Sequence, residues 1–408
     1  MPKRLKIAGT TLLLILIGLI AWDASRTKEP RYKGKPLSFW LAGHGCTEGQ
    51  TKEAVDHLGT NCIPTLLRML QANDSTIKQK LAALANGQNL IRIRMTDAHD
   101  KYIYAAHGFS LLGARAQGTV GVLIKLYEQS SPERKMSIGN AIGAIGPSAS
   151  EAIPTLLRAM ISTNEIVRDP AAFTLVASGF DPGLVVPGLA KALSDPNEST
   201  RMLAADSLSG FGTNAASALP ALIAAARDTN RNVRIEVISV LGSIRANPQL
   251  TVPALTNALT DSQYVVRAQA ASSLAEYGSN AASAIPLLIE LSKEDFVLDR
   301  NSALSALGSI HSKPDLTLPL LTNALTDHEE STRLAAAGAL GNFGNDAKSA
   351  WPALIDLYHR EQSQTAKDKR SISYSAEEIG AALLKIDPAA AAQAGINTNP
   401  PALYPSPD

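Results

Sequence analysis

Apolar and polar positions recur along this chain with a period of 33 residues. A proline that opens an apolar run, such as PALTNALTD, returns at each step. One period before the first of these prolines, Gly121 occupies the same place in VGVLIKL. The seven prolines are Pro154, Pro187, Pro220, Pro253, Pro286, Pro319 and Pro352.

Each period predicts a pair of antiparallel helices. After a polar break, the second run VVRAQAASSLAEYG carries apolar residues spaced like one face of a helix. A proline is tolerated in the first turn of the first helix, because its missing N–H would be unpaired there. A glycine eight residues before the next proline position is expected to end the second helix. These glycines are Gly146, Gly179, Gly212, Gly278 and Gly344.

Two charged positions recur with the same period. An acid stands where the first helix ends, at Asp195, Asp228, Asp261, Glu294 and Asp327. A base stands where the second helix begins, at Arg168, Arg201, Arg234, Arg267, Arg300 and Arg333, with Lys135 in the equivalent place. Stacking should bring these residues into a ladder across the turns. Partly exposed pairs of this kind contribute about 0 to 1 kcal/mol each, so the ladder is interpreted as structural.

This pattern resembles HEAT repeats, in particular the shorter bacterial kind also found in phycobilisome-lyase-like proteins. The matching features are the helix-one proline, the Asp-to-Arg spacing in TDSQYVVRAQAASSLAEYG and the terminal glycine, from Ala54 to Arg360. The resemblance implies an all-α, right-handed α-solenoid of about eight to nine helix pairs. In that family the charged ladder is structural.

The first unit contains an insertion. It starts at Pro64, but its successor Gly121 lies 57 residues later, which is 24 more than the period. The extra residues fall within 74–98 and include Arg92 and Arg94. Insertions in repeat arrays project from one face, which is often a binding face, so we expect a partner contact here or a capping role.

The ends of the array are expected to differ from its middle. Residues 23–53 predict a juxtamembrane linker and N-terminal cap, in which Trp40 covers apolar surface. The solenoid is assigned to 54–394, with Trp351 and the stretch EIGAALLKI in the second cap. Residues 395–408 are polar and proline-rich and are expected to be disordered.

The N-terminus predicts a membrane-targeting segment. A basic stretch, 1–6, precedes the uncharged run 7–22, which as a helix would measure roughly 24 Å against a hydrocarbon core of ~30 Å. We interpret 7–22 as a retained transmembrane signal anchor; a cleaved signal peptide and a buried helix are the alternatives. The juxtamembrane stretch also resembles, more loosely, bacterial membrane-anchored HEAT-repeat proteins of unassigned function.

Topology and redox state remain open at this point. The basic N-terminus favours a soluble body outside the cytoplasm, on the periplasmic side, although further basic residues follow the span. Secretion after signal cleavage is the alternative. Cys46 and Cys62, the two cysteines, could form a disulfide in an oxidising compartment. They could equally be two buried small apolar residues.

No catalytic or metal-binding motif is recognisable. Lys and Arg number 38 against 37 for Asp and Glu, so no net field favours nucleic acid. HEAT-like deoxyhypusine hydroxylases hold two irons through repeated His-Glu pairs, whereas this chain has one such pair, His328-Glu329, in a predicted turn. A bilin lyase is suggested by fold-level analogy alone. Neither a cofactor nor a metal is expected.

The predicted function is therefore a membrane-tethered scaffold or protein-interaction module without catalytic activity. Its partner is an unknown protein or peptide on the concave face, where one position of each second helix forms a row of mostly small or polar residues. The alternative is an enzyme or lyase subunit with a concave pocket. The candidate partner surface comprises Arg92, Arg94, His107, Asn140, Phe173 and Asp206, continued by Ser239, Ser272, Ser305 and Gly338.

A second period of 66 residues is superimposed on the first. Thr251–Asp261 returns as Thr317–Asp327, and the loops before the prolines alternate in kind. Arg245 and His311 replace the terminal glycine in alternate units. The sequence thus predicts a two-repeat module of four helices.

Overall fold

The computed structural model describes residues 29–43, 45–74, 97–367 and 374–396. The predicted anchor 7–22, most of the insertion with Arg92 and Arg94, and the tail 397–408 lie outside these residues. Among the described residues, no helix is both long and apolar enough to span a bilayer. The chain divides into two compact units, Met1–Asp181 and Pro182–Asp408.

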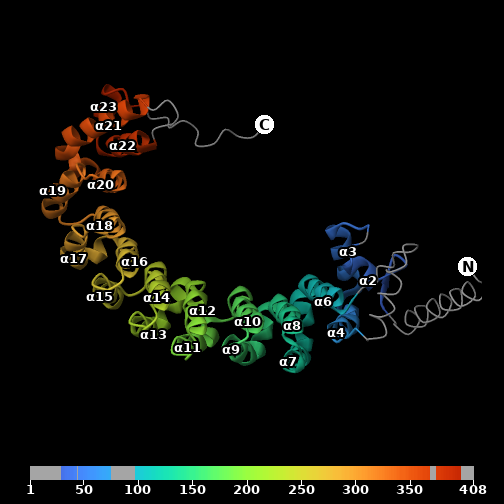
Figure 1. Ribbon diagram of the computed structural model, residues 1–408. Helices are drawn as coiled ribbons and strands as arrows, with labels where there is room; N and C mark the ends of the chain where they lie inside the picture. The colour runs from blue at the N-terminus through green and yellow to red at the C-terminus, as the bar shows by residue number, and fades with distance from the viewer. Residues whose placement is uncertain (1–28, 44, 75–96, 368–373, 397–408) are drawn as a thin grey trace, which may run out of the picture. The chain divides into compact units, whose positions relative to one another are not determined.

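The first unit confirms helix pairs on both sides of the insertion (Figure 1). Its helices are α2 (Leu37–Leu41), α3 (Glu48–Leu58), α4 (Ile63–Leu70), α6 (Ala98–Leu112), α7 (Val120–Gln129), α8 (Pro132–Ile145), α9 (Ile153–Met160) and α10 (Glu165–Ala177). The insertion falls between α4 and α6. The short 3₁₀ helices are η1 (Gly59–Cys62), η2 (Gly113–Thr119) and η3 (Gly146–Ala152).

A small antiparallel hairpin precedes the helices, which the all-α prediction missed. Strands β1 (Arg31–Tyr32) and β2 (Lys35–Pro36) pair across Lys33 and Gly34, which both have positive φ. A two-residue turn of this kind suits the twist of a hairpin. Trp40 is buried beneath it, as predicted, and its Nε1 donates to the carbonyl of Tyr32 at 3.3 Å.

The two cysteines lie in separate environments and are free thiols in the structure, which corresponds to the alternative without a disulfide. Cys46 is half-buried, with Sγ 3.6 Å from the carbonyl of Trp40 and 3.7 Å from Oγ1 of Thr51. Cys62 is fully buried. Burial raises the pKa of the Cys62 thiol to about 11, although the charge of Arg115 opposes the shift.

The second unit repeats the helix pair with little variation. Its helices are α11 (Pro182–Ala192), α12 (Glu198–Ser209), α13 (Leu219–Ala225), α14 (Arg231–Ile244), α15 (Pro248–Ala258), α16 (Tyr264–Ala275), α17 (Ile285–Leu291), α18 (Val297–Ile310), α19 (Pro314–Ala324), α20 (Glu330–Phe343), α21 (Trp351–Lys367), α22 (Tyr374–Ile386) and α23 (Pro388–Gln393). The 3₁₀ helices are η4 (Gly212–Ala218), η5 (Gly278–Ala284) and η6 (Gly344–Ala350).

First helices come in two forms that alternate, as the 66-residue period predicts. In α9, α13 and α17 the proline lies in the first turn, after a 3₁₀ helix that starts at a glycine. In α11, α15 and α19 the helix starts five residues before the repeat's proline, so Pro187, Pro253 and Pro319 lie inside it. The first-turn prediction was wrong for these three prolines, because Pro182, Pro248 and Pro314 already occupy the first position.

The early start of α15 and α19 depends on tight left-handed loops. Arg245 and His311 end the preceding helices in the left-handed conformation, with φ of 50° and 48°. Asn247 and Lys313 are left-handed as well, with φ of 44° and 49°. The loops before α15 and α19 therefore turn at two left-handed residues. The loops before α9, α13 and α17 instead contain a 3₁₀ helix that starts at a glycine.

Second helices pack much more closely on one another than first helices do. A Cβ on Gly242 would lie 2.7 Å from Oγ of Ser273, and one on Gly308 would lie 2.5 Å from Cα of Ala339. Both distances are shorter than any tolerated contact, so only glycine allows this approach. Because one layer is tighter than the other, the second unit curves with its second helices on the inner side (Figure 1).

The C-terminal end has a buried core of its own. Leu340, Leu354 and Ile379 are fully buried there, and Trp351 packs against the cluster, which agrees with the predicted cap. Ile396, which the sequence assigned to the disordered tail, is 5% exposed within the same cluster. The folded chain therefore extends past residue 394.

The charged ladder is present in the second unit and joins each repeat to the next. Nε and Nη2 of Arg201 donate to the two carboxylate oxygens of Asp228, 27 residues later, at 2.7 and 2.9 Å. Nη1 of the same guanidinium donates to the carbonyl of Asp195 in its own repeat at 2.9 Å. Arg234 repeats the arrangement with Asp261 at 2.8 and 2.9 Å. Each such arginine therefore links two repeats.

Three predicted members of the ladder are placed differently. Arg168 pairs with its neighbour Asp169 at 3.0 Å. Arg267 bonds to Asp299 and not to Glu294, so the predicted acid at this rung was wrong. Asp299 lies on the first turn of α18, five residues past the usual position, and reaches the guanidinium from there. Arg333 pairs with Glu361, which the pattern did not identify, at 2.9 Å.

The rung between Arg267 and Asp299 and the next rung, between Arg300 and Asp327, are less complete than the others. Oδ1 of Asp299 and both Nε and Nη2 of Arg300 are buried without a hydrogen-bond partner among the described residues. The nearest acid to Arg300 is Asp327, with 3.7 Å between Nε and Oδ2. Burial and the charge of Glu294 raise the pKa of the Asp299 carboxyl, whereas Arg267 lowers it; the net shift is upward.

We expect Asp228→Asn to destabilise the protein in a pH-dependent way. Burial raises the pKa of the Asp228 carboxyl, but the hydrogen bonds from Arg201 and the Asn230 amide outweigh it, so the folded pKa is lowered. The pair therefore stabilises the fold above the unfolded pKa of about 3.9 and ceases to do so as the pH falls through the folded value. Urea unfolding should show a cost of about 2 kcal/mol at pH 7, shrinking toward pH 3.

The control for this test is Glu128→Gln, which removes an exposed ion pair with Arg158. It should change stability by less than about 0.5 kcal/mol. Asp299→Asn should show the opposite pH trend, because a raised folded pKa makes the charged form unfavourable as the pH rises. Its stability relative to wild type should improve between pH 4 and pH 7. Parallel profiles for Asp228→Asn and Asp299→Asn would contradict this account.

We also expect the two thiols to differ sharply in reactivity. At pH 8 the Cys62 thiol is protonated and buried, so it should resist iodoacetamide in the folded protein. Cys46 is partly accessible and should be alkylated first. Peptide mass spectrometry after native labelling, and again after labelling in guanidinium without reductant, should find one and then both cysteines modified. A Cys46–Cys62 cross-linked peptide would contradict the structure.

Candidate functional site

The row of residues predicted as a partner surface lies on the second helices. In the first unit, Asn140 and Phe173 are exposed on α8 and α10, and His107 is half-buried on α6. Phe173 is 68% exposed, more than any other large apolar residue in the described part of the chain. Because α6, α8 and α10 pack side by side, these three positions form one row.

The row continues in the second unit with a more polar character. Asp206, Ser272, Ser305 and Gly338 are exposed and Ser239 is half-buried. Burial and the neighbouring charge of Asp206 raise the pKa of the Glu236 carboxyl. This side of the unit therefore offers small and acidic groups.

A groove lies on the other layer of the second unit, between the first helices α13 and α15. It has a volume of about 510 Å³, within the range of ligand-binding pockets. It opens because first helices of successive repeats approach each other less closely than second helices do. The sequence prediction placed the partner surface on the second helices and did not identify this groove.

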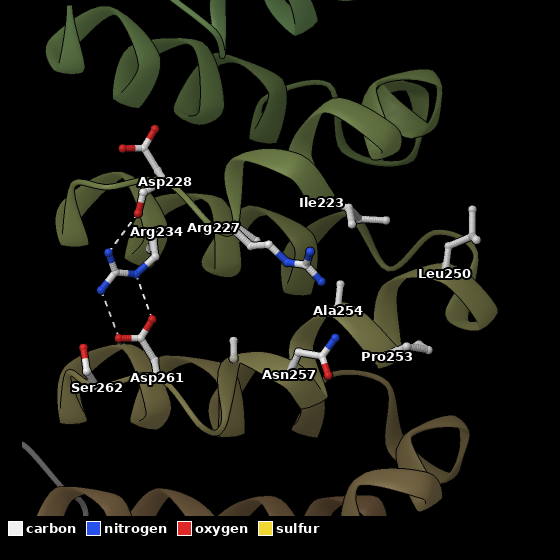
Figure 2. A pocket seen from close by; sticks show the side chains of 12 residues that line it. Ile223, Arg227, Asp228, Arg234, Leu250, Pro253, Ala254, Asn257, Asp261 and Ser262 are labelled. Carbon is white, nitrogen blue, oxygen red and sulfur yellow. Dashed lines mark hydrogen bonds and ion pairs between the residues drawn. The ribbon is translucent and has the colours of Figure 1, made fainter.

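The groove has one apolar wall and one charged wall, as Figure 2 shows. Leu250, Pro253 and Ala254 of α15 face Ile223 of α13. On the opposite side lies the rung between Arg234 and Asp261.

The side chain of Arg227 extends into the space between these two walls (Figure 2). Its guanidinium makes no hydrogen bond or ion pair with any residue that the structure describes. The neighbouring carboxylates are already engaged, since Asp228 pairs with Arg201 and Asp261 with Arg234. Arg227 is therefore an exposed cation whose charge no partner neutralises, next to apolar surface.

The sequence did contain a signal for this groove in its 66-residue period. Leu184, Leu250 and Leu316 occupy the third position of the long first helices and are 54%, 50% and 56% exposed. Large apolar side chains at equivalent exposed positions are unusual enough to indicate a surface with a use. Their position outside the predicted concave row kept them out of the candidate list.

No metal site is formed by the described residues. Groups of three or more His, Cys, Asp or Glu side chains with suitable geometry do not occur among them. His57 contacts the Tyr32 ring, and His311 contacts the Phe343 ring. His328 lies in the turn before α20 beside Asp327 and Glu329, as predicted.

Comparisons with known proteins identify the repeats. The family model for HEAT repeats matches residues 186–275, 219–308 and 287–371. No curated protein matches the chain in sequence.

Solved structures agree on the fold. Kap121p bound to Nup53p has a TM-score of 0.54 at 13% identity, over 86% of this chain and 41% of that one. Importin beta has a TM-score of 0.54 at 14% identity, over 86% of this chain and 51% of that one. This chain thus spans about half or less of each karyopherin, and the similarity is one of fold. Residues 186–371 of this protein thus match the family model for HEAT repeats, and the chain has an all-α solenoid-like fold similar to that of karyopherins.

Proposed function

We propose that this chain is a membrane-tethered HEAT-repeat scaffold that binds a segment of another protein and has no catalytic activity of its own. The proposal rests on exposed side chains that have no partner among the described residues and that lie on a framework of repeated helix pairs. Phe173 on one layer and Leu250 on the other are large apolar side chains exposed to water, and Leu250 shares its groove with the unpaired cation Arg227.

The structural similarities support binding of extended segments. The Kap121p structures hold Nup53p in one case and the extreme C-terminus of the phosphatase Cdc14p in another. Stacked helix pairs suit this role, because each repeat contacts only its neighbours and the array presents a long surface. The same architecture places small side chains along the second helices of this chain.

The membrane tether rests on the sequence of residues 7–22. An uncharged run of this length behind a basic N-terminus favours a single-pass anchor, with the repeats on the periplasmic side. A tethered scaffold would gather its partner at the membrane surface. Release after signal cleavage is the other outcome that the sequence allows.

Membrane fractionation tests the tether. The full chain should sediment with membranes and stay there after a carbonate wash, because the uncharged segment 7–22 anchors it. A chain that starts at Glu29 should be soluble. N-terminal sequencing of the membrane-bound material should find the original N-terminus. Solubility of both forms would contradict the anchor, and a new N-terminus after residue 22 would indicate cleavage.

Site-specific photo-crosslinking tests the binding role. Benzoylphenylalanine at Phe173 or Leu250 in the full chain, expressed in its native membrane, should give discrete adducts of higher mass. The same group at Ile161, which is 48% exposed at the end of the first helix α9, serves as the matched control and should give few. Absence of specific adducts at both test positions would count against a scaffold. Stoichiometric iron or a bound visible chromophore in the purified protein would favour the enzyme or lyase alternative.

A further inference from the structure

We infer that the groove between α13 and α15 binds a peptide segment in which an aspartate or glutamate stands beside an aliphatic residue. The inference rests on the proposed function, since it names the chemistry of one partner of the scaffold. The groove is part of the second unit, and all of its lining comes from consecutive repeats.

The apolar wall selects the aliphatic part of the ligand. Leu250 is 50% exposed, and Pro253 beside it is exposed too. Neither side chain has a polar atom, and Ala254, which lies next to the Arg227 guanidinium, is small enough to leave a depression (Figure 2). A Leu, Ile or Val side chain would cover this surface and release its water.

The charged wall selects a carboxylate. The arginines and acids of the ladder alternate and neutralise one another: Arg201 with Asp228, and Arg234 with Asp261. Arg227 therefore gives the groove one positive charge that no acid in the described part of the chain neutralises. A carboxylate matches its guanidinium in geometry, and a hydrogen-bonded pair of this kind is strongest where water is partly excluded.

The ladder also argues against a more highly charged ligand. Asp228 and Asp261 both line the groove but are paired with arginines, so one surplus positive charge remains, whereas a phosphate carries nearly twice the charge of a carboxylate. Asn257 on α15 adds a side-chain amide that can donate to the ligand's backbone. The groove therefore fits a peptide with a single negative charge at this point.

The next copy of the two-repeat module supplies a natural comparison. Sixty-six residues on, Lys293 replaces Arg227, and Leu320 replaces Ala254. Lys293 is already paired, because its Nζ lies 2.8 Å from Glu290, where the first copy has Ala224. The second copy thus has a neutralised cation and a larger side chain in the same place. These are two of the positions at which the lining of the two copies differs, and the ones that change its charge pairing and its depth.

Two variants follow from this comparison. Ala254→Leu introduces the residue found at the equivalent position 320 and should fill the depression without disturbing the helix. Arg227→Gln removes the surplus charge from an exposed side chain. Lys293→Gln is the matched control, since it removes an exposed base from the other copy. Urea unfolding midpoints should be unchanged for all three, which separates loss of binding from loss of folding.

The test begins with random dodecapeptides displayed on phage and selected against the full chain in lipid nanodiscs, with counter-selection on Ala254→Leu. Recovered peptides should carry Asp or Glu next to Leu, Ile or Val. Fluorescence anisotropy with a labelled recovered peptide should show that Arg227→Gln weakens binding by about ten-fold or more, and that Lys293→Gln changes it by less than about two-fold. Binding should weaken as NaCl is raised.

Several results would overturn the inference. Recovered peptides without a carboxylate, or with equal affinity for wild type and Arg227→Gln, would remove the charge argument. Peptides or cross-linked partners that bind wild type and Ala254→Leu alike would leave the scaffold function standing and reject the groove. Self-association that Ala254→Leu abolishes would assign the groove to a second copy of the chain. Failure of both the selection and the cross-linking at Phe173 and Leu250 would reject the scaffold as well.

Discussion

The guanidinium that joins consecutive repeats is the contact on which the second unit depends. Arg201 holds the end of its own first helix through the carbonyl of Asp195 and the next repeat through the carboxylate of Asp228. The acid in turn accepts the amide of Asn230, which fixes the turn into the following helix. One side chain thus sets both the geometry within a repeat and the step to the next. Since the pair is mostly buried, breaking it costs more than an exposed ion pair would.

Because the ladder fixes the turns, the first helices can vary in where they begin. With the turns held by the ladder and the second helices held by glycine contacts such as Gly308 on Ala339, the first helices need only pack onto their own partners. They can begin at either of two positions, as the two loop types show. The outer layer is therefore loosely spaced, and the spacing between α13 and α15 leaves room for a groove. A binding surface here is a consequence of where the packing is tight and where it is not.

The repeat, the helix pairs and most of the ladder could be predicted from the sequence, because each depends on spacing along the chain. What could not be predicted depends on distance in space. Glu294 stands at the periodic position, yet Asp299, five residues later on the first turn of α18, is the acid that reaches Arg267. Pro253 matches the other prolines in sequence, but it lies inside a helix because Pro248 starts α15 earlier. The hairpin at Lys33 and Gly34 was too short to show a pattern at all.

The groove illustrates why the site was harder to predict than the fold. The fold depends on similar residues at equivalent positions of many repeats, and this recurrence is visible in the sequence as a period. A site arises where one copy departs from its neighbours, as Ala224 and Ala254 depart from Glu290 and Leu320. Such departures look like noise until the structure shows that Ala224 leaves Arg227 without a partner and Ala254 opens the space in front of it. In a repeat protein the differences between equivalent positions are therefore the most direct guide to function, and each copy serves as the control for the next.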